Sequence, residues 1–141
     1  MKDLIFPGFG TMRSSAGLLA VRLVAGIAFV LHGWGKIQQP FSWMGPDAQV
    51  PGIFQALAAV SEFFGGLAWI VGLLTPLASF GMLCTMSVAT MYHATKGDPF
   101  VGKGGPSYEL ALVYWTISLL LITAGPGRFS LDALLFGREG R

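Results

Sequence analysis

Charge is scarce in this sequence. Only 11% of its 141 residues are Asp, Glu, Lys or Arg and 53% are hydrophobic, whereas about a quarter of an ordinary soluble domain is charged. A soluble fold of this length has too small an interior to cover so much apolar surface, so we expect lipid to cover it. The nine Lys and Arg residues are dispersed and the net charge is only +2, which argues against nucleic acid as a partner.

Cysteine is nearly absent as well. The single one, Cys84, stands in an apolar stretch, and we interpret it as a small buried side chain. One cysteine cannot form an internal disulfide or a thiolate cluster, and we expect no metal site.

Long apolar stretches are what the sequence has instead. Four of them approach the roughly 20 residues that a helix needs to cross a bilayer; they cover about residues 16–37, 53–74, 77–95 and 107–124. We therefore predict an all-α membrane four-helix bundle that forms one domain over residues 1–141. A short helix at about residues 129–136, capped by Ser130, is predicted to lie in the membrane interface.

The lengths of the connections predict a topology. The second and third stretches are joined by little more than Thr75 and Pro76, which predicts a tight antiparallel hairpin. The two longer loops, 38–52 and 96–106, then fall on one side of the membrane. Five Lys and Arg residues flank the other side, against three on the loop side, so we expect both termini in the cytoplasm.

Two ionisable residues fall inside the predicted spans. Arg22 lies in the first and Glu62 near the middle of the second. An unpaired charge there costs about 2.5 to 3.5 kcal/mol, and we estimate a depth difference of roughly 7 Å, within reach of an arginine. We therefore predict a buried Arg22–Glu62 ion pair. It has two open interpretations: a device that fixes helix register, or part of a functional site.

Small residues accompany both of these residues along one helix face. Gly26 and Gly33 share the face of Arg22, while Gly65, Gly66 and Trp69 mark the face of Glu62. Two such faces could enclose a flat ligand with Trp69 as an aromatic wall. They could equally pack against each other, which is the commoner use of small residues in membrane helices.

Further ionisable residues stand near the predicted outer ends of the helices. They are His32, Lys36, His93 and Glu109, and we expect them to converge at one end of the bundle. Because His32 and His93 are predicted at similar depth, they could also act as the two imidazole ligands of a haem. We disfavour haem, because nothing else in the sequence indicates it.

Several short motifs in order resemble the DoxX family of small four-helix membrane proteins. They lie at residues 22–26, 32–36, 62–66, 72–77, 108–112 and 125–132. The resemblance covers nearly the whole chain. It implies a multi-pass protein of a bacterial-type plasma (inner) membrane, associated with redox chemistry.

The resemblance also implies a function. Relatives of this type are linked to thiosulfate:quinone oxidoreduction and to other membrane redox assemblies, so we expect a quinone-interacting subunit that works with other subunits or as a homo-oligomer. His32, Glu62 and Glu109 would supply protons, while Arg22 and Lys36 would stabilise a reduced, anionic ring. We expect no intrinsic cofactor and no complete redox cycle in this chain alone. The alternatives are a non-catalytic accessory subunit that docks onto a larger membrane complex and, less favoured, a transporter of a small solute.

Overall fold

The fold is entirely helical in the part of the chain that the structure describes. The structure is a computed structural model, and it describes residues 10–137. It has five helices: α2 (Met12–Gln38), α3 (Gly52–Val71), α4 (Thr75–Thr95), α5 (Glu109–Ala124) and α6 (Leu131–Phe136). The all-α prediction is confirmed, and each predicted helix lies within a few residues of an observed one.

Local signals explain the helix ends. The Thr11 side chain accepts from the Ser14 N–H and the Ser14 side chain from the Thr11 N–H, a capping box that starts α2 before the predicted residue 16. Ser130 caps α6 by accepting from the Ala133 N–H, as predicted. At the end of α3, Gly72 adopts a left-handed conformation with φ of 68°, which glycine does at no steric cost.

Glycine brings α2 and α3 into backbone contact. A Cβ atom on Gly26 would lie 2.8 Å from the Gly66 carbonyl oxygen, and one on Gly33 would lie 2.6 Å from the Phe63 nitrogen. Only glycine permits such close approach of two membrane helices. The two small-residue faces therefore pack against each other over much of their length, which was the second of the two interpretations.

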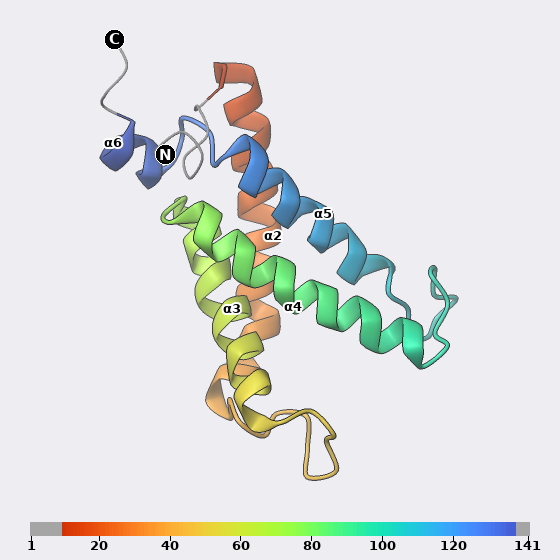
Figure 1. Cartoon of the computed structure of the whole chain (residues 1–141). Coiled ribbons are helices and arrows are strands. Elements are labelled where there is room, and N and C mark those ends of the chain that lie inside the picture. Colours follow the sequence, from red (N-terminus) through yellow and green to blue (C-terminus); the bar gives the residue numbers. More distant parts are fainter. Residues whose placement is uncertain (1–9, 138–141) are drawn as a thin grey trace.

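The remaining long helices, α4 and α5, form a second pair that crosses the first (Figure 1). The Trp115 indole N–H donates to Ser87 Oγ between α5 and α4. Bulky side chains fill the crossing, where the Phe29 ring contacts the Trp69 and Tyr114 rings. Met82 and Leu121 are fully buried in the same core.

Beyond the crossing the two pairs separate. Figure 1 shows α4 leaving α3 at a wide angle, so that the loop of residues 39–51 and the loop of residues 96–108 lie far apart. The predicted hairpin of α3 and α4 is confirmed at its short connection, beside which the two helices pack against each other, but the hairpin opens farther along. Left-handed Gly72 and Leu74, with φ of 68° and 49°, turn α4 aside.

Two helices are long and apolar enough to cross a bilayer by themselves. These are α2 and α3, whereas α5 is apolar but only 16 residues long. Within the described residues α4 does not combine length and apolar composition in the way that α2 and α3 do. Cys84, predicted to be buried, is exposed on α4. The crossing of the membrane by α4 and α5 stays a prediction.

Candidate functional site

Arg22 is the most heavily bonded side chain of the bundle. Its Nε donates to the Trp69 carbonyl at 2.8 Å, and Nη2 donates to the Ile70 carbonyl at 3.3 Å. Nη1 donates to Pro126 at 2.6 Å, and both terminal nitrogens donate to Phe129 at 3.0 Å. These bonds use the five N–H donors of a guanidinium, and the residue is 1% exposed. Arg22 thus joins α2 to the end of α3 and to the segment before α6.

The predicted Arg22–Glu62 ion pair is wrong. Trp69, which Arg22 contacts, lies two helical turns after Glu62 on α3, roughly 10 Å along the axis. The prediction compared the depths of Arg22 and Glu62 by placing the centres of the two helices at the same level in the membrane. The glycine contacts set the register instead, and they place Lys36 rather than Arg22 beside Glu62.

Lys36 and Glu62 form the ion pair of the α2–α3 interface. Lys36 Nζ lies 2.7 Å from each carboxylate oxygen of Glu62. The Glu62 side chain is 5% exposed and the Lys36 side chain 25%. The pair is therefore buried on the Glu62 side and accessible on the Lys36 side.

An indole ring covers this ion pair. Lys36 Nζ lies 4.4 Å from the centre of the Trp43 ring, a cation–π contact. Trp43 is held in place by its indole N–H, which donates to the Gln55 carbonyl at 2.9 Å. The Gln55 side chain accepts from the Met44 N–H and donates to the Val50 carbonyl. Buried Gln55 thus folds the loop of residues 39–51 over Lys36.

Gln55 and Trp43 were not among the predicted site residues. A signal for Gln55 was present, because it is polar, lies in an apolar helix, and precedes Glu62 by two turns on the same face. Trp43 carries no comparable signal. Its position depends on how an irregular loop folds back, which periodicity does not describe.

The other predicted residues do not join this site. Trp69 is 0% exposed and donates its indole N–H to Ser79, so it belongs to the core.

The ionisable residues predicted at the outer helix ends lie on different helix pairs. His93 Nδ1 lies 2.7 Å from Asp98, and Glu109 is exposed at the start of α5; both residues are on the diverging second pair. His32 is exposed one turn before Lys36, and no hydrogen bond or ion pair links it to Lys36 or Glu62 among the described residues. The predicted convergence of His32, Lys36, His93 and Glu109 is therefore wrong, since the ends of the two helix pairs lie apart.

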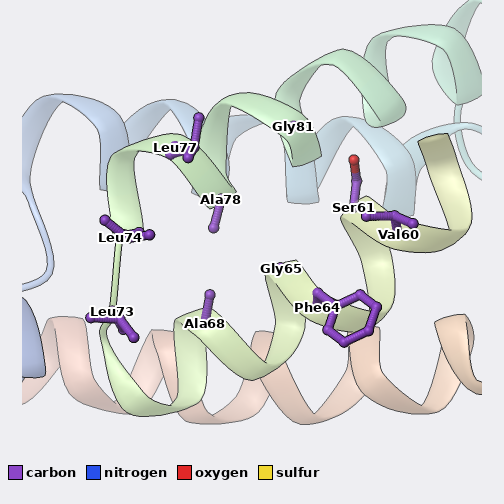
Figure 2. Close-up of a pocket in the computed structure, with 10 residues that line it drawn as sticks. All are labelled: Val60, Ser61, Phe64, Gly65, Ala68, Leu73, Leu74, Leu77, Ala78 and Gly81. Carbon is purple, nitrogen blue, oxygen red and sulfur yellow. The ribbon is translucent and has the colours of Figure 1, made fainter.

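A second feature is an apolar groove between α3 and α4. Its volume is about 310 Å³, the lower end of the range for ligand pockets. Figure 2 shows the residues that line it: Val60, Ser61, Phe64, Gly65, Ala68, Leu73, Leu74, Leu77, Ala78 and Gly81. Gly65, from the small-residue face predicted on α3, is among them, whereas Lys36 and Glu62 are not. The groove is thus separate from the Lys36–Glu62 pair.

Chemically, the Lys36–Glu62 pair offers a proton-exchanging group and a cation beside an aromatic face. In general, a carboxyl group can exchange a proton with a ligand, and an ammonium group can stabilise negative charge on a ligand oxygen. The low dielectric of the surroundings strengthens both effects. Such an arrangement fits a flat, uncharged ligand that gains charge during reaction.

Comparisons with known proteins give a family and several relatives. The sequence model described as DoxX matches residues 17–95. "Inner membrane protein YqjF" of Escherichia coli is 36% identical over 129 residues, which are 84% of this chain and 92% of that protein. "Putative oxidoreductase CatD" of Bacillus subtilis is 30% identical over 129 residues, which are 85% of this chain and 87% of that protein. An uncharacterized protein of Haemophilus influenzae is 33% identical, with 84% and 90% covered. No solved structure matches the chain.

Proposed function

Because this chain belongs to the DoxX family of membrane proteins, we propose that it is an inner-membrane subunit of an oxidoreductase system that contacts a quinone at the Lys36–Glu62 pair. The name of the Bacillus subtilis relative supports the redox part of this proposal. The word "inner" in the name of the Escherichia coli relative supports the location.

The observation that carries the proposal is the ion pair under Trp43. Charges inside a membrane protein are expensive, and those that persist mark functional sites by default. Here the pair is not sealed, because a quarter of the Lys36 side chain remains exposed. In this proposal a ligand approaches Lys36 from its exposed side, next to the aromatic Trp43 ring.

The chemistry of quinone reduction matches these groups. A quinone takes up two electrons and two protons, and its oxygens become negatively charged before they are protonated. Lys36 would stabilise that charge, and Glu62 would take up protons from water and pass them one at a time to the reduced quinone. The electrons would come from a partner subunit, since one cysteine cannot cycle as a dithiol.

Binding of a short-chain quinone to the purified chain in mild detergent tests the proposal. Quenching of tryptophan fluorescence would report binding, and extraction would report native quinone. We expect Lys36→Met and Glu62→Gln to weaken binding about tenfold, equivalent to about 1.4 kcal/mol. Trp43→Phe should reduce the quenching. Lys103→Met, in the exposed loop of residues 96–108, is the control and should bind normally.

Native binding by the Lys36 and Glu62 variants, together with no quinone in the purified protein, would refute the site. A second candidate would then gain weight: a non-catalytic accessory subunit. One observation favours it, namely that Arg22 and Trp69 are both committed to structural bonds. Mass measurement after mild solubilisation tests this candidate, which requires a ligand-free particle with a fixed number of other proteins.

We also propose that both termini face the cytoplasm. The Lys and Arg residues near the termini outnumber those in the two long loops, and such an excess favours the cytoplasmic side.

A further inference from the structure

Residues 126–132 are built into the connection between α3 and α4. The Asp132 N–H donates to the Gly72 carbonyl at 2.8 Å. A Cβ atom on Gly72 would lie 2.5 Å from Ser130 Cβ and 2.7 Å from Arg22 Nη2. The segment thus contacts the connection at backbone distance, and Arg22 holds it from the other side through Pro126 and Phe129.

This segment caps the start of α4, and Arg22 satisfies carbonyl groups at the end of α3. No side chain caps α4 from its own N-cap residue, Leu74. Instead the Asp132 carboxylate accepts from the Leu74 N–H at 2.7 Å and from the Thr75 N–H at 2.9 Å. A carboxylate is favoured there by the partial positive charge of a helix N-terminus, and Arg22 is favoured at the carbonyls that end α3.

The connection that these caps hold is strained. Leu74 has a φ of 49°, a left-handed conformation that is unfavourable for a residue with a Cβ atom. Such a conformation persists only where the surroundings enforce it. Asp132, which is 0% exposed, binds the Leu74 N–H directly and so stabilises this conformation from outside the turn.

We infer that residues 126–132 act as a strap that fixes the angle between the α2–α3 pair and the α4–α5 pair. α4 begins at Thr75, so its direction depends in part on the backbone of Leu74 and Thr75, and the strap binds both N–H groups. Release of Asp132 allows Leu74 to relax and α4 to change direction. The distance between the Lys36–Glu62 pair and the loop of residues 96–108 changes with it. A ligand or modification that displaces the strap would therefore alter the angle between the two helix pairs.

Distance measurement between two spin labels tests the strap. Gly35 and Gly105 are suitable label sites, because an added Cβ atom meets nothing within 4 Å at either position. The full chain, with Cys84→Ser, Gly35→Cys and Gly105→Cys, would be measured in lipid nanodiscs. We expect Asp132→Ala to broaden the distance distribution and shift its mean. Asp132→Asn keeps one acceptor oxygen and should cause a smaller change in the same direction.

Leu134→Ala is the matched control, since Leu134 lies on the same helix and is 70% exposed. It should leave the distribution unchanged. The strap is refuted if Asp132→Ala and Asp132→Asn, with native helix content by circular dichroism, both give the parental distribution. An equal broadening in Leu134→Ala would also refute it, because the cause would then be α6 in general. If Asp132→Ala does not fold, Asp132→Asn decides.

Discussion

At the scale of single residues, Arg22 shows how a charge is kept inside a bundle without a carboxylate partner in direct contact. Four carbonyl oxygens accept its five hydrogen bonds. These carbonyls come from the end of α3 and from the segment before α6, where helical partners are missing. The guanidinium is suited to this task because its donors are spread over a rigid plane, whereas the lysine ammonium is compact.

Arg22→Lys should therefore destabilise the protein. The ammonium cannot reach all four carbonyls, and each buried acceptor left unpaired costs about 1 to 3 kcal/mol. We expect a loss of at least about 2 kcal/mol in the free energy of unfolding, measured by thermal or denaturant unfolding in detergent. Arg13→Lys, at an exposed position of the same helix, is the control. Equal stability of the two variants would contradict the role of Arg22.

The Lys36–Glu62 pair allows structure and function to be separated. Removing one partner leaves a buried charge alone, which costs about 3 to 5 kcal/mol. We expect Lys36→Met and Glu62→Leu each to destabilise the protein strongly, and the double variant to recover most of the stability. Denaturant unfolding measures this. If quinone binding stays lost in the stable double variant, the pair acts on the ligand; if binding returns, the pair is only structural.

The sequence was sufficient to identify the ionisable residues whose burial costs free energy, but not to identify their partners. Arg22, Lys36 and Glu62 stand out because charge is rare in this chain. Which of them meet depends on the register of α2 against α3, and backbone contacts at Gly26 and Gly33 set that register. Hydropathy does not predict these backbone contacts, so the predicted register of α2 against α3 was wrong by about two helical turns.

At the scale of elements, α2 has two glycines near its end that differ in their surroundings, because only Gly33 lies in the α2–α3 interface. Gly33 has no room for a side chain, since its Cβ would lie 2.6 Å from the Phe63 backbone nitrogen, whereas Gly35 faces open space. Gly33→Ala should push α2 and α3 apart and destabilise the protein by about 1 to 3 kcal/mol. Gly35→Ala should be neutral or stabilising by up to about 1 kcal/mol.

Thermal unfolding of both variants measures this difference. The prediction fails if Gly33→Ala unfolds at the same temperature as Gly35→Ala. Quinone binding should weaken in Gly33→Ala as well, because Lys36 lies on α2 less than one turn after Gly33 and Glu62 precedes Phe63.

Helix positions were predictable because apolar stretches and caps are local. Ser130 caps α6 as predicted, whereas α3 ends at left-handed Gly72, inside the predicted stretch of residues 53–74. The angle between α3 and α4 was not predictable. It depends on left-handed Leu74, a conformation that leucine rarely adopts and that Asp132 enforces from 58 residues further along the chain.

At the scale of the whole molecule, the two helix pairs are not equivalent. The α2–α3 pair contains the helices able to span a bilayer on their own and also holds the Lys36–Glu62 site. The α4–α5 pair is inclined to it (Figure 1). With 16 residues, α5 is roughly 24 Å long, shorter than the hydrocarbon core of about 30 Å. An inclined helix of this length spans only if the bilayer thins or the flanking loop enters the interface.

Labelling of single cysteines in intact cells distinguishes four crossings from two. In a Cys84→Ser background, an impermeant maleimide should label Ser42→Cys and not Arg13→Cys, because we expect the termini inside. We expect Gly105→Cys to be labelled too, since four crossings place the loop of residues 96–108 outside. If α4 and α5 only lie in the inner interface, Gly105→Cys reacts only after lysis while Ser42→Cys still reacts in intact cells. Labelling of Arg13→Cys but not Ser42→Cys would instead reverse the orientation.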